Sequence, residues 1–321
     1  MKKIAIIGNC QSLPLAELLR ALCPDIKFVA LTAVHRIEAG EVQKFLSILH
    51  TFDAVITQSI KAGYRDKIGV DTDNLRHNMV PQQKLVLIPN LYFEGLFPTW
   101  GYMNYKNTKL RGKMPPDLLP KAALQGVFAT LRKMDYNCFF LLCAWFNSMT
   151  IDQTIAVLET PFDLDAVRVW SDNSLAEFAQ REKTLHTQML SLVQEIVKKP
   201  DTKYWFHSFN HPNKALLEML AVQVLEVLNI KKRPHACVDT IPDRLGNIFL
   251  PVYPLVMSSL SVERIGMERL KIYDASFSIS EFVQHYFTYF DCLGKAGLSV
   301  NCANKKYILC EKLLFKTGNL C

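Results

Sequence analysis

Residues 2–15 read Lys2-Lys3-Ile4-Ala5-Ile6-Ile7-Gly8-Asn9-Cys10-Gln11-Ser12-Leu13-Pro14-Leu15. A short apolar run ends at Gly8, and the leucines that follow are spaced for one buried helical face. The stretch therefore predicts a strand, a tight turn and a helix, with Asn9, Cys10 and Gln11 at the carboxyl end of the strand. In an open α/β sheet, ligands bind at that edge.

The amino-terminal third continues in the same alternation. Strands are predicted at residues 3–7, 27–31, 53–57 and 84–88, and helices at residues 12–22 and 39–50, with a helical or irregular stretch at 71–78. Strands that alternate with helices at this spacing predict an α/β fold, a parallel open sheet with flanking helices.

The rest of the chain divides into three predicted parts. Residues 1–117 form the amino-terminal α/β half and end in a long loop at 89–117, which is typical of a lid or binding loop. Residues 118–200 are predicted to be a helical insertion subdomain, with helices at 118–134, 138–158 and 175–198. Residues 201–321 supply a return strand at 203–207, a helix to about residue 228, a helix at 278–290 and an irregular remainder. We expect these parts to form one compact unit.

Composition limits the class of protein. Half of the residues are hydrophobic and 21% are charged, which is ordinary for a soluble globular protein. Nine cysteines without a C-x-x-C pair favour a reducing compartment and argue against a disulfide framework or a metal site. The apolar runs are too short for a signal peptide or a transmembrane segment, so a cytoplasmic protein is expected. The net charge of +7 suits phosphate-bearing ligands, and no nucleic-acid-binding motif is present.

Two turns offer a nucleophile and a base. Cys10 or Ser12 is the candidate nucleophile, and the helix dipole is expected to make the Cys10 thiol acidic. The alternative is that Cys10 packs as a small hydrophobe, as most free cysteines do. His211 is the candidate base, because Asn210 and Pro212 suit the start of a helix that follows the return strand. If both strands lie in one parallel sheet, Cys10 and His211 share an edge.

Other polar residues on this rim could complete a site. Asn9, Gln11, Asn90 and the backbone N–H groups of the first helical turn could stabilise an oxyanion. Gln58 closes the strand at 53–57, and charged or aromatic residues follow it at Lys61, Tyr64 and Arg65. A second basic stretch holds Lys106, Lys109, Arg111 and Lys113. These loops are either solvated or contact phosphates. The turn after Gly8 lacks the glycines of a dinucleotide fingerprint, which disfavours an NAD site.

Four motifs in this order resemble the WcbI family of bacterial capsular polysaccharide-biosynthesis proteins. They are Gly8-Asn9-Cys10-Gln11, Thr57-Gln58, Ile88-Pro89-Asn90-Leu91-Tyr92-Phe93 with Gly95 and Pro98, and Phe209-Asn210-His211-Pro212. The resemblance runs from residue 1 to about residue 230. It implies an enzyme that binds coenzyme A and transfers acetyl from acetyl-CoA to a sugar hydroxyl of a nucleotide sugar or polysaccharide.

The resemblance also assigns residues. It implies that Asn9, Cys10, Gln11, Gln58, Asn90 and His211 surround the reacting groups, with Asn210 beside them. Coenzyme A is then expected to contact Gly8, Ser12, Lys61, Tyr64, Arg65, Lys109 and Arg111. The family is similar in turn to the SGNH/GDSL hydrolases, which implies an SGNH-hydrolase-like arrangement of the sheet. This sequence departs from that pattern, since Cys10 replaces a serine and Ser208 stands where an aspartate is expected.

Several interpretations stay open on the sequence. Cys10 could take the acetyl group and pass it on, or His211 could deprotonate the sugar hydroxyl for direct attack on the thioester. The partner that orients His211 is unassigned, and His207 is a nearby alternative to it. The same residues could serve an esterase or thioesterase, or a non-catalytic coenzyme A- or sugar-binding partner of the capsule assembly machinery.

Overall fold

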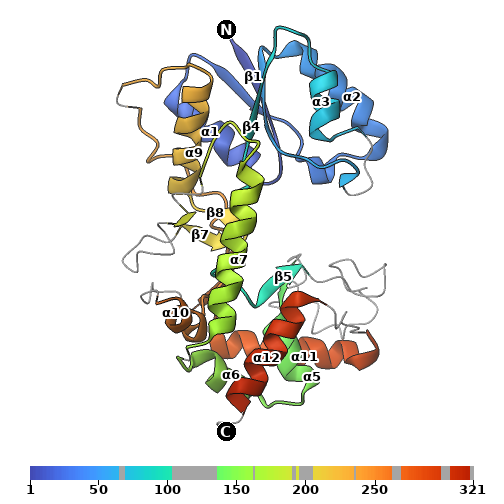
Figure 1. The fold of residues 1–321 in the computed structure, drawn as a ribbon, viewed down its shortest axis with the longest axis vertical. Coiled ribbons are helices and arrows are strands. Elements are labelled where there is room, and N and C mark those ends of the chain that lie inside the picture. Colours follow the sequence, from blue (N-terminus) through green and yellow to red (C-terminus); the bar gives the residue numbers. More distant parts are fainter. Residues whose placement is uncertain are drawn as a thin grey trace. The chain divides into compact units, whose positions relative to one another are not determined.

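The structure is a computed structural model that describes residues 1–64, 69–102, 136–161, 163–189, 193–194, 205–234, 236–261, 269–297 and 304–318 (Figure 1). The chain divides into two compact units. The first unit comprises Met1–Tyr92, Leu175–Ile196 and Tyr204–Gly246, and the second comprises Phe93–Ser174, Val197–Lys203 and Asn247–Cys321. These boundaries differ from the three parts that the sequence led us to expect, 1–117, 118–200 and 201–321.

The first unit is built on a four-stranded sheet with the order β2-β1-β3-β4. Its strands are β1 Lys3–Ile7, β2 Lys27–Ala30, β3 Ala54–Gln58 and β4 Lys84–Ile88. Every pair in the sheet is parallel. The two central strands, β1 and β3, are buried on both faces, which is why they contain the apolar runs Ile4–Ile7 and Ala54–Ile56. The predicted α/β fold with a parallel open sheet is confirmed.

Helices cover both faces of this sheet (Figure 1). They are α1 Ser12–Leu22, α2 Val42–Ser47, α3 Thr72–His77 and α9 Lys214–Val227. Successive side chains of a strand point to opposite faces. Ala5 of β1 accordingly packs in a cluster with Phe45 of α2, whereas Ile6 lines an apolar region with Leu15 of α1 and Leu217 of α9. The helix expected at 39–50 is divided into the 3-10 turn Ala39–Glu41, α2 and the 3-10 turn Ile48–Thr51.

The return strand does not join the parallel sheet as expected. β7 Phe206–Ser208 pairs in antiparallel fashion with β8 His211–Pro212. The expected cap at Asn210 is also wrong, because residues 211 and 212 are held in this hairpin and the Asn213 N–H bonds to the Trp205 carbonyl at 2.8 Å. Helix α9 therefore starts after the hairpin, and Asn213 caps it by accepting from the Leu216 N–H.

The second unit is mainly helical. Its helices are α5 Phe139–Phe146, α6 Ile151–Glu159, α10 Pro254–Leu260, α11 Ile279–Gly297 and α12 Lys305–Gly318. Helix α7 Asp165–Glu182 belongs to both units: its residues up to Ser174 are part of the second unit, and the remainder is part of the first. Short strands accompany the helices: the antiparallel pair β5 Trp100–Tyr102 and β6 Tyr136–Cys138, and a sheet of β9 Ile248–Phe249, β10 Arg269–Ile272 and β11 Ala275–Ser278.

Three expectations for this part of the chain need correction. The helix predicted at 138–158 is two helices, separated near Ser148, which has a φ of 59°. The helix predicted at 175–198 begins at Asp165 and ends at Glu182. The region after residue 231, expected to be irregular except for one helix, holds α10, α12 and the small sheet as well as α11. The helix predicted at 118–134 lies outside the described residues. Over the described ranges, no helix is both long and apolar enough to cross a membrane.

Candidate functional site

The turn between β1 and α1 depends on Gly8. A Cβ added at Gly8 would lie 2.6 Å from Oε1 of Gln58 and 2.9 Å from its Cδ, closer than side chains tolerate. The missing side chain lets Gln58, at the end of β3, reach across and accept a hydrogen bond from the Asn9 N–H at 2.9 Å. The absence of a side chain at Gly8 therefore lets the turn after β1 form a hydrogen bond with the end of β3.

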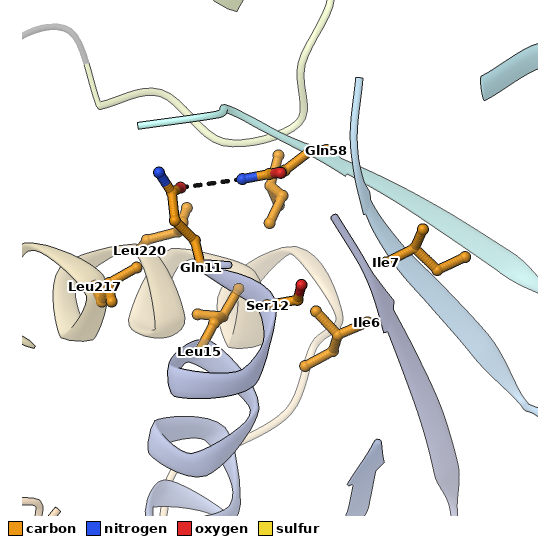
Figure 2. A pocket seen from close by; sticks show the side chains of 9 residues that line it. Ile6, Ile7, Gln11, Ser12, Leu15, Gln58, Leu217 and Leu220 are labelled. Carbon is orange, nitrogen blue, oxygen red and sulfur yellow. Dashed lines mark hydrogen bonds between the residues drawn. The ribbon is translucent and has the colours of Figure 1, made fainter. Parts of the chain in front are cut away.

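Gln11 is the centre of a buried amide network. Its Oε1 accepts from Gln58 Nε2 at 3.0 Å, as Figure 2 shows, and from the Leu91 N–H at 3.1 Å. Its Nε2 lies within hydrogen-bonding distance of Asn90 Oδ1 at 3.2 Å and of two carbonyls, Leu91 and Asn210, each at 2.9 Å. A carboxamide has two hydrogens to donate, and both are engaged here. Gln11 thus connects the turn to the ends of β3 and β4 and to the β7–β8 hairpin.

Apolar side chains shield this network from one side. Figure 2 shows Ile6 of β1, Leu15 of α1 and Leu217 and Leu220 of α9 around the Gln11–Gln58 bond. Hydrogen bonds in such a low-dielectric setting are stronger, and an amide that lost its partner there would be costly. The network is therefore expected to be rigid.

Asn9 and Asn90 complete the network and differ in how many of their amide hydrogens remain available to a ligand. Asn9 Nδ2 donates to Asn90 Oδ1 at 3.0 Å, and Asn9 Oδ1 accepts from the Gln11 N–H at 2.9 Å. Asn90 lies just beyond β4 and is partly exposed. Its Nδ2 has no hydrogen-bond acceptor within the described part of the chain. Of the amides expected to stabilise an oxyanion, Asn90 keeps both of its Nδ2 hydrogens for a ligand, whereas Asn9 gives one of its two to Asn90.

The N–H groups at the start of α1 form hydrogen bonds within the β1–α1 turn. The Gln11 N–H bonds to the Asn9 side chain, and the Ser12 N–H bonds to the Asn9 carbonyl at 3.2 Å. The Ser12 hydroxyl is buried and donates to the same carbonyl at 2.5 Å. These N–H groups, expected as oxyanion donors, are thus satisfied inside the turn, and Ser12 is engaged as a donor rather than poised as a nucleophile.

Cys10 is partly exposed beside this network. Burial raises the pKa of its thiol to about 11, although its own backbone N–H and the charge of Arg36 lower it in part. The expectation of an acidic thiol is therefore wrong, because Asn9 occupies the N–H groups that would have stabilised a thiolate and desolvation dominates. At neutral pH Cys10 is a protonated thiol.

His211 is buried in β8. Its pKa is lowered to about 4, mainly by burial and also by the charge of His207, although a hydrogen bond with the Leu245 backbone and the charge of Asp243 raise it in part. A helix dipole does not account for this neutral imidazole. The physical cause is desolvation, since α9 begins three positions later, at Lys214.

Sequence reasoning missed Asp243. Its Oδ2 accepts from His207 Nε2 at 2.8 Å and from the Lys214 N–H at 3.1 Å. Burial raises the pKa of Asp243, but the hydrogen bond and charge of His207 outweigh that effect and hold the pKa below its usual range. The one available signal was indirect, because Ser208 replaces the expected aspartate and the carboxylate had to come from elsewhere.

The remaining predicted residues fall into two groups. Lys61 is exposed, and Tyr64 is partly buried against the apolar cluster on the α2 face of the sheet. The basic residues expected to contact phosphates lie outside the described residues; they are Arg65, Lys106, Lys109, Arg111 and Lys113. Across the described ranges, no group of three histidine, cysteine or acidic side chains is placed to hold a metal ion.

The sequence matches the model of a family described as the polysaccharide biosynthesis enzyme WcbI over residues 3–233. The chain belongs to the WcbI family. The match includes Cys10, the whole amide network and His211, and it stops before Asp243. No curated protein matches the chain.

A solved structure of WcbI, described as a novel polysaccharide biosynthesis enzyme, has the same fold. The TM-score is 0.76 and 98% of each chain is covered, at 16% sequence identity. That structure is described as the native protein without a disulfide bond between coenzyme A and one of its cysteines. A likeness at this identity shows that this member of the WcbI family shares the fold over almost its whole length.

Proposed function

We propose that this chain is a coenzyme A-dependent O-acetyltransferase that acetylates a sugar hydroxyl in capsular polysaccharide biosynthesis. One contact carries the proposal: Gln11 Nε2 lies 2.9 Å from the Asn210 carbonyl, so the residue before His211 is tied to the residue after Cys10. A neutral imidazole and the amide network that includes the free donor of Asn90 are thereby joined in one unit. The family supplies the polysaccharide context, and the description of the related structure supplies coenzyme A beside a cysteine.

The reaction follows from the state of His211. Its imidazole is neutral at pH 7 and can accept the proton of the sugar hydroxyl. The sugar oxygen attacks the thioester carbonyl, the C–O bond forms, the C–S bond breaks, and His211 returns the proton to the leaving thiolate of coenzyme A. Asn90 Nδ2 donates to the carbonyl oxygen while it carries negative charge.

Cys10 favours direct transfer over a covalent intermediate. With a pKa of about 11, its thiol is almost entirely protonated at neutral pH. We assign Cys10 to contact with the thioester sulfur, and the mention of a disulfide bond between coenzyme A and a cysteine in the description of the related structure, which lacks that bond, supports the assignment. The phosphates of coenzyme A are assigned to Lys61 and to the basic residues Arg65, Lys109 and Arg111.

The test is acetyl transfer from acetyl-CoA to nucleotide sugars and capsular oligosaccharides. His211→Asn is expected to lose about 10²–10⁴-fold in transfer while coenzyme A still raises the melting temperature. His77→Asn is the matched control, because His77 is exposed on α3. Undiminished transfer by His211→Asn would contradict the role of His211.

Cys10→Ser separates the two mechanisms. Direct transfer predicts that most activity survives and that mass spectrometry finds no acetyl group on Cys10. Loss of transfer together with a trapped acetyl-enzyme in the wild type would establish the covalent route. Rapid hydrolysis of acetyl-CoA, with no transfer to any acceptor, would instead identify a thioesterase.

A further inference from the structure

Asp243 and His207 form a shielded pair next to His211. The atoms Asp243 Oδ2 and His207 Nε2 are 2.8 Å apart, and the two side chains are 33% and 12% exposed. Asp243 is held in place from a second side by the Lys214 N–H, at the first residue of α9. An ion pair in this setting is screened less by solvent than one on the open surface.

The backbone keeps His207 close to His211 and close to Asp243. In the β7–β8 hairpin, His211 pairs with Ser208, and His207 is the residue just before Ser208 on β7. The turn after Asp243 is tight, because the Gly246 N–H bonds to the Asp243 carbonyl at 3.2 Å. A Cβ at Gly246 would lie 3.3 Å from the Asp243 carbonyl oxygen and 3.4 Å from His207 Nε2, so this loop packs against the imidazole.

We infer that Asp243 is a positioning residue for His211 and acts on it through His207. The inference rests on the proposed role of His211 as the base. Ser208 cannot supply the missing carboxylate, and its hydroxyl donates instead to Asn210 Oδ1 at 3.0 Å. Asp243, which comes from beyond the part of the chain that matches the family, supplies the charge.

The charge of Asp243 favours the protonation of His211, which burial makes unfavourable. A buried imidazole resists protonation, yet His211 must carry a proton while the sugar oxygen attacks. The carboxylate favours that imidazolium, and the proton that His207 shares with Asp243 fixes the orientation of the His207 ring. Among the described residues, the side-chain charges that act on His211 are those of His207 and Asp243.

The test is an NMR titration of His211 in the full-length protein with labelled histidine. Asp243→Asn removes an anion, so the pKa of His211 is expected to fall. His207→Gln removes a cation, so the pKa is expected to rise. The signs are opposite because the charge of Asp243 raises the pKa of His211 and that of His207 lowers it. Asp239→Asn is the matched control, since Asp239 is exposed in the same segment and should leave the titration unchanged.

The pH dependence of transfer gives a second measurement in case the protein unfolds near pH 4. His207→Gln is expected to move the acid limb of kcat/KM into the range above pH 5, whereas Asp243→Asn should keep that range flat and lower kcat. Unchanged titrations, or shifts of both variants in one direction, would overturn the inference. The titration needs no turnover, so opposite shifts in an inactive protein would retain the inference and reject only the proposed transferase.

Discussion

In the first unit the buried polar centre is a network of neutral amides, whereas in the second unit it is an ion pair. Gln58 donates a hydrogen bond to Gln11, and both side chains accept from backbone N–H groups. Lys306 Nζ lies 2.9 Å from Glu94 Oε1 and also donates to the Trp100 carbonyl. Neutral amides are inexpensive to bury once they are paired, but a charge taken from water needs a counter-charge. The first arrangement contains no charged side chain, and the second links distant segments of one unit.

The ion pair predicts the largest effect on stability. Burial lowers the pKa of Lys306, and the charge of Glu94 opposes that shift. Lys306→Met leaves Glu94 buried without its partner and is expected to cost about 3–5 kcal/mol in the free energy of unfolding. Urea denaturation followed by tryptophan fluorescence measures the loss. The double variant Lys306→Met/Glu94→Leu should recover much of it, and a single variant that costs less than about 1 kcal/mol would show that the pair is solvated.

The raised pKa of Cys10 predicts that its thiol reacts slowly with alkylating reagents. A thiol with a pKa of about 11 holds roughly a hundredfold less thiolate at neutral pH than a thiol with an ordinary pKa of 9.0. Iodoacetamide should therefore modify the exposed Cys237 first and Cys10 later, with the Cys10 rate rising about tenfold per pH unit. Coenzyme A should slow the reaction further. Mass spectrometry of digested protein gives both rates, and faster labelling of Cys10 than of Cys237 at pH 7 would mean that its thiol is activated.

Gln11→Leu tests the amide network itself. The variant leaves Gln58 Nε2 and the Leu91 N–H without an acceptor in an apolar setting, and each unsatisfied group costs about 1–3 kcal/mol. Thermal unfolding should show a loss in that range, reduced where water enters. Gln284→Leu, an exposed glutamine on α11, is the control and should stay within about 0.5 kcal/mol. Equal losses in both variants would mean that the network contributes nothing beyond a surface glutamine.

The same contrast explains what the sequence could predict. The strand, turn and helix of residues 3–22 are encoded locally, in an apolar run followed by helical periodicity, and the structure has them at the predicted residues. Parallel strands end at one edge, so the gathering of Asn9, Gln58 and Asn90 also followed from the pattern. These predictions needed only neighbours in sequence and one rule about sheets.

The predictions that failed depended on hydrogen bonds and side-chain partners that hydrophobic periodicity does not encode. The cap of α9 was misplaced because the β7–β8 hairpin, closed by the Trp205 carbonyl, holds residues 211 and 212. The acidity of Cys10 was misjudged because the Asn9 side chain folds back on the turn. Asp243 and Lys306 have no local signal at all, since each acquires its role only when a partner arrives from another segment.

Asp71 combines features of both polar centres, because it is a charged carboxylate that is hydrogen-bonded by neutral donors. It caps α3, and its carboxylate accepts from the Asn74 N–H at 3.0 Å and from Asn74 Nδ2 at 2.6 Å. These hydrogen bonds hold the pKa of Asp71 below its usual range. The adjacent Thr72 hydroxyl accepts from the Ile60 N–H at 2.8 Å, so the cap also anchors the loop that follows β3.

Asp71→Ala is expected to give the smallest of these effects, about 0.5–2 kcal/mol at pH 7. Because the folded pKa is depressed, this stabilisation is complete above the unfolded pKa of about 3.9 and is lost as the pH falls through the folded value. The difference between wild type and variant in urea denaturation should therefore shrink as the pH is lowered below 4. Asp73→Asn, at an exposed position in the same turn that accepts no cap bond, should show no such convergence. A difference that persisted at low pH would mean that the Asp71 side chain stabilises α3 by packing, and that charge has no part in the cap.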